Sequence, residues 1–458
     1  MKKGIVNRMI ICLMAVTFLG AHVYGQEQNS TASNKKLEKK ILTLDECLSI
    51  AMDNNVQLKR ARNNALIAKS NQFQALMNFL PNLSGSANYN YFDGTNFDNS
   101  SGQFFTGSFK RSNPSLDASI QVFNAGSNVY NKISTTKALE ASTYSIEEQK
   151  QVVKSSVLGS YLAVVLDKEN IRISNDRISL LEQQLTREKK RQEVGVGNLE
   201  QVYNFQSQLA NEKLRKVNLE NTYKTDLLQL LQALQIDVSS NMDIAPYDFG
   251  ADELLLSVEN YPEILKSSLA YSPGLKRAEA SAIASKYNFK STQARMYPTI
   301  SAYTSYGTQY SSNNRNEDGE IPILDQYQNL TTTLIGARID IPIFNNYRNR
   351  NSTQVARLNM ENSALDLKQS ELDINNTIQR VYLDLISAQE TYEAAEDNLV
   401  SLNQSYEFVK TRYENGNTDF FTYLESLNNK NRAEIELVNA KYSIVFRKKI
   451  LDVYRGLL

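Results

Sequence analysis

The sequence offers few side chains of the kinds that carry out covalent chemistry. It contains one histidine, His22, and two cysteines, Cys12 and Cys47. Its carboxylates and tyrosines are scattered, without the spacing of a metal site, a glycine-rich phosphate loop or a nucleophile motif. We therefore expect that the protein is not an enzyme and that it binds no cofactor and no metal. Cys47 is expected to be a small buried side chain on a helix.

Residues 1–25 have the pattern of a secretory signal peptide. The segment begins with the basic residues Lys2, Lys3 and Arg8, continues with the apolar run Met9–Leu19, and ends with small residues up to Gly25. Its removal would also remove His22 and leave the mature chain slightly acidic. This slightly negative net charge does not suggest a nucleic-acid partner. The single cysteine that remains, Cys47, excludes an intrachain disulfide. Residues 26–41 are polar and are expected to form a flexible N-terminal arm.

The C-terminal quarter of the chain has the pattern of a long helical hairpin. From Asn345 to Leu458 there is no proline, and Gly416 divides the segment into two arms. A helix from about Asn346 to Glu414 would be roughly 100 Å long. Its apolar or small residues recur at alternating steps of three and four, which is typical of a left-handed coiled-coil seam: Ile378, Val381, Leu385, Ala388, Tyr392, Ala395, Leu399, Leu402, Tyr406, Val409 and Tyr413. The second arm can fold back with Phe420, Leu424 and Leu427.

The sequence contains an internal duplication. One constant shift along the chain places Phe123 on Phe344 and the Arg191-x-Glu193-x-Gly195 motif on Arg412-x-Glu414-x-Gly416. A slightly smaller constant shift aligns the earlier parts of the two copies, with Pro81 on Pro298. We therefore divide the chain into a first repeat (42–237), a connecting element (238–257) and a second repeat (258–458). Asp167 and Glu188 fall where the second copy has Ala388 and Val409, which suggests different neighbours.

Before each predicted hairpin the hydrophobic period changes from helical to two. A capping box at Thr43–Glu46 opens a helix expected to run to Pro81. Two alternating runs follow in each copy: 83–91, 116–122, 300–306 and 337–343. Polar loops, Phe92–Ser115 and Ser311–Leu330, are expected to join them.

These runs match outer-membrane barrel strands, with a soluble antiparallel hairpin as the alternative. Four strands do not close a barrel, so a chain that spans a bilayer with them must oligomerise.

The layout resembles the TolC-like family of outer membrane efflux proteins over nearly the whole mature chain. The resemblance rests on the duplicated order of helix, strands and long hairpin, with Pro81 and Pro298 before strands and glycine turns at Gly195 and Gly416. It implies a mainly helical protein with membrane strands. Three chains would form an α-helical barrel capped by a twelve-stranded transmembrane β-barrel, with four strands from each protomer.

The resemblance also implies a function. The homotrimer would lie in the outer-membrane lipid of a Gram-negative bacterium and extend into the periplasm. It would be the passive exit duct of a tripartite efflux or type I secretion system, joined to an inner-membrane pump by a periplasmic adaptor. The alternative is a secreted coiled-coil structural or interaction protein. Drugs, metal ions, polypeptides and glycans all remain open as cargo.

The family's periplasmic gate is carried over only in part. Its tyrosine falls on Tyr413, its two aspartates on Thr422 and Glu425, its basic residue on Thr418 and the carboxylate partner of that residue on Gln201. The salt bridge that latches the family's tunnel is therefore missing, and Asp419 is a candidate second carboxylate. The residues beside the glycine turns are expected either to contact the adaptor or to stabilise the helix ends locally: Arg191, Glu193, Gly195, Arg412, Glu414 and Gly416.

Overall fold

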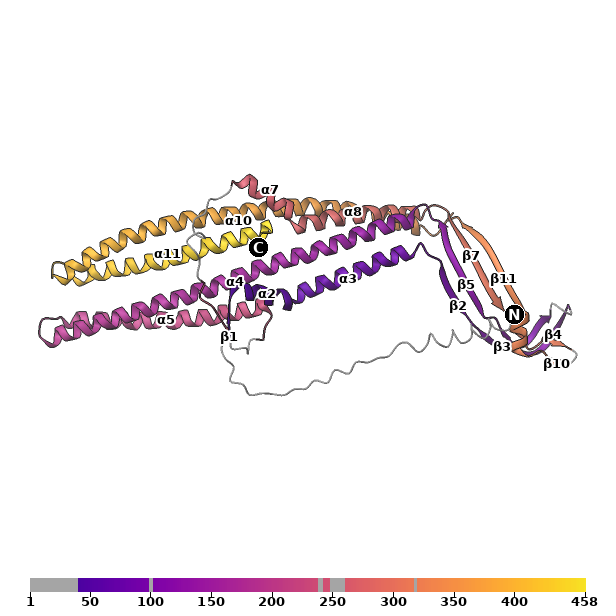
Figure 1. Cartoon of the computed structure of the whole chain (residues 1–458), viewed down its shortest axis with the longest axis horizontal. Helices are drawn as coiled ribbons and strands as arrows, with labels where there is room; N and C mark the ends of the chain where they lie inside the picture. Colours follow the sequence, from indigo (N-terminus) through magenta and orange to yellow (C-terminus); the bar gives the residue numbers. More distant parts are fainter. Residues whose placement is uncertain (1–39, 99–101, 238–241, 248–259, 317–318) are drawn as a thin grey trace. The chain divides into compact units, whose positions relative to one another are not determined.

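A computed structural model of the chain describes residues 40–98, 102–237, 242–247, 260–316 and 319–458. Residues 41–458 form one compact unit, which contains every helix of the described ranges (Figure 1). The predicted signal peptide, most of the predicted arm and much of the connecting element lie outside the described residues.

The helices occur as two matching sets. The first set is α2 (Leu44–Asn54), α3 (Val56–Met77), α4 (Ser127–Glu193) and α5 (Leu199–Leu234). The second set is α7 (Tyr261–Tyr271), α8 (Pro273–Ala294), α10 (Arg348–Glu414) and α11 (Phe420–Arg455). Corresponding helices have equal lengths, which are 11 residues for α2 and α7, 22 for α3 and α8, 67 for α4 and α10, and 36 for α5 and α11. The duplication is therefore confirmed.

Helices α4 and α5 pair as one hairpin and α10 and α11 as another (Figure 1). The predicted seam of α10 faces inward, with Ile378, Leu385 and Tyr406 among its buried residues. A core cluster joins α2, α4, α5, α7, α10 and α11, and Cys47 is buried in it. This burial raises the pKa of the Cys47 thiol to about 12.

The predicted continuous helix from Thr43 to Pro81 is wrong, because the chain forms two helices there. The capping box is present, since the Glu46 amide donates to the Thr43 hydroxyl and the Thr43 amide donates to the Glu46 carboxylate. The first helix ends at Asn54, because the extended ψ of 117° at Asn55 interrupts it. The side chain of Asn55 then accepts from the Leu58 amide of the second helix. The amide of Val56 donates to Oε1 of Gln235, the residue that follows α5, at 2.8 Å. Tertiary contact thus compensates for the break.

Both strands expected from each copy contribute to one antiparallel sheet. The predicted run 83–91 is divided, however, because residues 82–86 form a strand of this sheet and residues 89–91 begin a strand of another sheet. The members of the shared sheet are β2 (Asn82–Ser86), β5 (Ser115–Phe123), β7 (Thr299–Thr308) and β11 (Thr331–Asp340). They lie in the order β11-β7-β5-β2, with Gly85 opposite Leu116 and Ala302 opposite Ala337. Since β5 leads into α4, the sheet is attached to the helix end remote from the hairpin turn.

The predicted loop Phe92–Ser115 is mostly a further hairpin of β3 (Tyr89–Asp98) and β4 (Gln103–Ser112). The rings of Phe92 and Phe109 stack across it at 4.9 Å, so cross-strand aromatic pairing outweighs the polar composition that suggested a loop. The other predicted loop contains short elements: β8 (Tyr310–Ser311), β9 (Arg315–Asn316), β10 (Gly319–Glu320) and α9 (Ile323–Asn329).

The end of the predicted N-terminal arm is also structured. Strand β1 (Lys40–Leu42) pairs with β6 (Met242–Ile244), and the Ala245 amide donates to the Leu42 carbonyl at 2.8 Å. Lys40 and Ile41 are therefore part of a small sheet rather than of a flexible arm. In the described part of the chain, no helix has both the length and the apolarity that crossing a membrane requires.

Candidate functional site at the hairpin tips

Each hairpin turns on a glycine with positive φ, which is +79° at Gly195 and +74° at Gly416. The amide of Gly416 donates to the Tyr413 carbonyl, and the next amide, of Asn417, donates to the Arg412 carbonyl at 2.8 Å. The first turn has the equivalent bonds. Side chains other than that of glycine are strained in this conformation, so both predicted glycine turns have a physical basis.

An aromatic cluster near the tips joins the two hairpins. Its buried members come from all four long helices: Leu181 of α4, Phe205 of α5, Tyr406 of α10, and Phe420, Tyr423 and Leu427 of α11. The Phe205 and Phe420 rings meet edge to face at 4.9 Å. Because Phe205 and Phe420 belong to different hairpins, separating the tips would expose this apolar surface to water.

Tyr413 and Gln201, two residues assigned to the gate by resemblance, are in contact. The Tyr413 hydroxyl donates to Oε1 of Gln201 at 3.4 Å. Burial raises the pKa of Tyr413 to about 12, and the nearby Glu188 carboxylate adds to the rise. The hydroxyl is therefore protonated at neutral pH and remains a donor across the two hairpins.

Asp419 and Thr422, two further predicted gate residues, form the start of α11. The carboxylate of Asp419 accepts from the Thr422 amide at 2.9 Å and from the Thr422 hydroxyl at 2.6 Å. These bonds lower the pKa of Asp419, with the hydroxyl of Thr422 as the main cause. Asp419 is thus an ionised helix N-cap, and its negative charge interacts favourably with the positive end of the dipole of α11.

Thr418 and Glu425 are not brought into this network. Thr418 is half-buried and Glu425 is exposed. Within the described ranges, neither side chain makes a hydrogen bond or an ion pair with the rest of the chain. The position that carries the family's basic residue therefore makes no latch to Gln201 here.

The tip residues divide between local contacts and contacts across the hairpins. Arg191 pairs with Glu188 of its own helix at 3.4 Å, and Arg412 donates to the Asn417 carbonyl of its own turn at 3.2 Å. Glu414 instead forms an ion pair with Arg187 of the other hairpin, with the two atoms 3.5 Å apart. Glu193 is exposed.

Sequence reasoning missed several residues that join the hairpins. Nε2 of Gln184 on α4 donates to the Tyr423 hydroxyl on α11 at 2.5 Å. Farther from the tips along the same helices, Arg177 donates to the Asn431 carbonyl. Tyr423 lies three residues after Phe420 and four before Leu427, a helical spacing that could have identified it, whereas the predicted seam used Leu424. Gln184 carries no comparable signal.

Two strand-attached coiled-coil hairpins that contact each other near their tips are the architecture of channel-forming export proteins of the outer membrane. A family model described as "Outer membrane efflux protein" matches residues 47–234 and 264–451, one segment in each half. The chain belongs to this family.

Solved structures of outer membrane channels share the fold. The CmeC channel of Campylobacter jejuni has a TM-score of 0.76 at 17% sequence identity, covering 96% of this chain and 94% of that one. VceC of Vibrio cholerae has a TM-score of 0.76 at 14% identity, over 90% and 96% of the two chains. The open MtrE channel of Neisseria gonorrhoeae has a TM-score of 0.68 at 16% identity, over 96% of each chain. A comparison with curated proteins gave no match.

The family assigns the chain as an outer membrane efflux channel of Gram-negative bacteria, of the kind that serves tripartite efflux systems. It also confirms the predicted TolC-like resemblance and the interpretation of the chain as a transport protein rather than an enzyme. The alternative of a secreted coiled-coil structural protein is set aside.

Proposed function

We propose that three copies of this chain form the passive exit duct of a tripartite efflux system, gated at the periplasmic helix tips. The contacts between the two hairpins of one chain carry this proposal. A duct that opens at its tips must separate neighbouring helices there, and the present chain joins α4 to α10 and α11 by bonds that can be broken one at a time.

The strands support a trimer. The four-stranded sheet ends at β2 on one side and at β11 on the other. Both edge strands carry backbone groups that need partners inside a bilayer. Copies of the chain would supply them, and three sets of four strands would close a twelve-stranded barrel, which is within the range of such barrels.

The closed tips would be held by bonds that replace the family's missing salt bridge. Tyr413 bonds to Gln201, Arg187 pairs with Glu414, and Gln184 bonds to Tyr423. The ion pair is about half exposed on both sides and contributes little alone. The buried bond of Gln184 and the aromatic cluster contribute more, because the groups they join lose water when they pair.

The tips would also meet the adaptor that links the duct to an inner-membrane pump. Around the first turn the exposed side chains include Val194, Val196 and Leu199, and at the second turn Phe421 is 61% exposed. Apolar groups of this size at a turn favour a protein partner over water. Arg191, Glu193, Arg412 and Glu414 are exposed at the same two turns and would form the polar rim of such a contact.

Planar-bilayer recording of the purified protein tests the duct and its gate. We expect discrete conductance steps from a trimer counted by chemical crosslinking. Tyr413→Phe combined with Arg187→Gln removes two contacts between the hairpins and should raise the closed-state conductance. Arg357→Gln is the matched control, because the Arg357 side chain pairs with Glu361 of its own helix, α10, at 3.0 Å.

Each outcome separates one part of the proposal. Discrete trimer steps with unchanged closed conductance in the double variant would place the gate elsewhere and keep the duct. A folded protein that gives no conductance steps would overturn the duct itself.

A further inference from the structure

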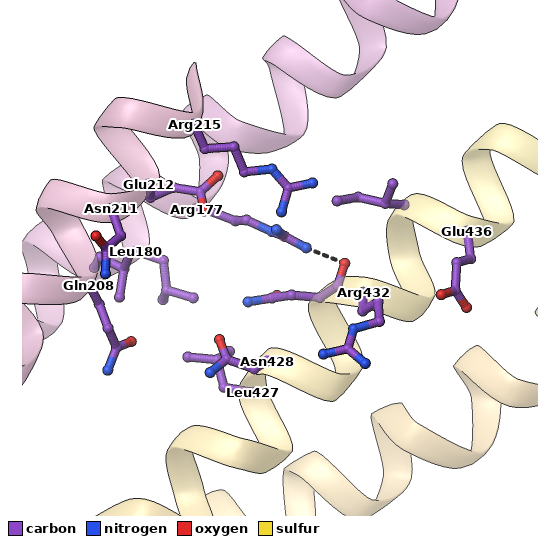
Figure 2. A pocket seen from close by; sticks show the side chains of 13 residues that line it. Arg177, Leu180, Gln208, Asn211, Glu212, Arg215, Leu427, Asn428, Arg432 and Glu436 are labelled. Carbon is purple, nitrogen blue, oxygen red and sulfur yellow. Dashed lines mark hydrogen bonds between the residues drawn. The ribbon is translucent and has the colours of Figure 1, made fainter. Parts of the chain in front are cut away.

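A groove of about 540 Å³ lies between the first hairpin and α11, farther from the tips than the aromatic cluster. It is lined by charged and amide side chains and by a few leucines (Figure 2). Arg177 comes from α4, Glu212 and Arg215 come from α5, and Arg432 and Glu436 come from α11. The groove therefore brings three guanidinium groups and two carboxylates together from three helices.

Arg177 is the buried member of this set. Its side chain is only 9% exposed, and one of its terminal nitrogens donates to the Asn431 carbonyl of α11. Its Nε is fully buried and has no acceptor among the described residues. Burial lowers the pKa of the guanidinium, an effect that Glu212 opposes and Arg215 reinforces. A buried donor without an acceptor carries a desolvation cost, so the protein compensates the burial of this guanidinium only in part.

The lining of the groove itself has three guanidinium groups and two carboxylates, an excess of one positive charge. Figure 2 shows the side chain of Arg215 extending toward that of Arg177. In the described part of the chain, Arg215 and Arg432 are exposed and form no ion pair. One oxygen of Glu212 accepts from the Ser174 hydroxyl at 2.7 Å, and Glu436 is exposed. Glu434 of α11 also acts on Arg177 but lines a neighbouring cavity.

We propose that this groove binds a compact oxyanion, a phosphate or carboxylate group, through Arg177, Arg215 and Arg432. Guanidinium groups present paired N–H donors that match two oxygens of such an anion, and desolvation strengthens these bonds. The side-chain amides of Gln208, Asn211 and Asn428 line the same space and can donate further bonds. A ligand held by all three arginines ties the first hairpin to α11.

Thermal unfolding of the full-length protein in detergent tests the site. Inorganic phosphate and citrate are titrated in separate series, with chloride keeping the ionic strength constant. We expect at least one probe to raise the unfolding midpoint saturably. Arg215→Gln combined with Arg432→Gln should weaken the apparent affinity by about tenfold or more. Both side chains are exposed, so the variant is expected to fold.

Arg380→Gln is the matched control, because Arg380 is exposed on α10 outside the groove. It should retain the wild-type response. An equal rise of the midpoint in the wild type and in both variants would show a general salt effect and overturn the site, as would no response to either probe. These measurements require neither conductance nor an adaptor, so they stand apart from the test of the duct.

Discussion

The ring of Tyr413 stacks on the ring of Tyr423, with centroids 4.7 Å apart and planes inclined by 13°. Tyr413 is the third residue before the second glycine turn and Tyr423 is the fourth residue of α11. The stack therefore closes the second hairpin at its tip. The two hydroxyls reach across to different residues of the first hairpin, Gln201 and Gln184.

Tyr423→Phe should destabilise the protein by about 1–2 kcal/mol, because it keeps the stacked ring and removes the acceptor of the buried Gln184 amide. Urea unfolding followed by circular dichroism measures the change. Tyr203→Phe is the control, since Tyr203 is 61% exposed on α5 and should change stability little. Equal effects of the two substitutions would show that the bond to Gln184 contributes nothing.

Glu425→Gln should reduce cation selectivity. The carboxylate of Glu425 is exposed and unpaired within the described chain, and in a trimer three such groups would concentrate negative potential at a narrow opening. We expect the ratio of cation to anion permeability to fall by about twofold or more, with weaker block by divalent cations. Reversal potentials in salt gradients measure the ratio.

The control for this measurement is Glu193→Gln, which removes an exposed carboxylate from the tip of the first hairpin. If it changes selectivity as much as Glu425→Gln does, the effect belongs to the general charge of the tips. Unchanged selectivity and block in Glu425→Gln would sink the assignment of Glu425 to the gate.

Asp167→Asn should stabilise the protein at neutral pH. Burial raises the pKa of Asp167 from 3.8 to about 6, and the neighbouring Asp226 adds to the rise. The folded state thus binds this proton more tightly than the unfolded state does, so the wild type gains stability as the pH falls from above 6 toward 4. Above pH 6 the ionised carboxylate lowers the free energy of unfolding. The uncharged amide of the variant removes this effect, so we expect the free energy of unfolding to rise by about 2 kcal/mol.

Urea unfolding at pH 4.5 and pH 7.5 separates this effect from general packing. We expect the difference between wild type and Asp167→Asn to be large at the higher pH and small at the lower one. Asp366→Asn is the control substitution, because the Asp366 side chain is exposed on α10. A difference that is independent of pH would mean that Asp167 does not titrate in this range.

Substitutions of glycine by alanine should separate backbone strain from crowding. Gly416→Ala should cost about 1–2 kcal/mol, because φ is +74° at this turn although nothing lies near the added methyl group. Gly197→Ala should cost more, since its Cβ would lie 2.5 Å from the Gln192 nitrogen. Gly159→Ala on α4 has open space and should stabilise by about 0.5–1 kcal/mol. Thermal unfolding of the three variants gives the order.

The seam of α10 and the repeated helices were predictable because they depend on periodicity within one segment. Ile378, Leu385 and Tyr406 recur at coiled-coil spacing. The constant shift that places Gly195 on Gly416 also places both ends of α4 and α5 on the ends of α10 and α11. Tyr413 and Gln201, which the resemblance assigned to the gate, are in contact in the structure, and their role in a gate stays a prediction.

Pairing between separate segments caused the errors. The break at Asn55 is sustained by Gln235, which lies far along the chain, and β3 pairs with β4 through Phe92 and Phe109, inside a segment whose composition favours a loop. Neither pairing changes the local period of the sequence around it.

The sequence by itself therefore determined the duplicated long hairpins, the glycine turns and the two-stranded contribution of each copy to the sheet. Hydrophobic periodicity and backbone conformation depend on a few neighbouring residues, and both patterns occur in each of the two repeats. Only the tertiary structure decided which residues join one hairpin to the other: Gln184 with Tyr423, Arg187 with Glu414, and the three arginines around the groove. These contacts depend on how each supercoiled hairpin is rotated about its axis relative to its neighbour. The packing of the whole core sets that rotation.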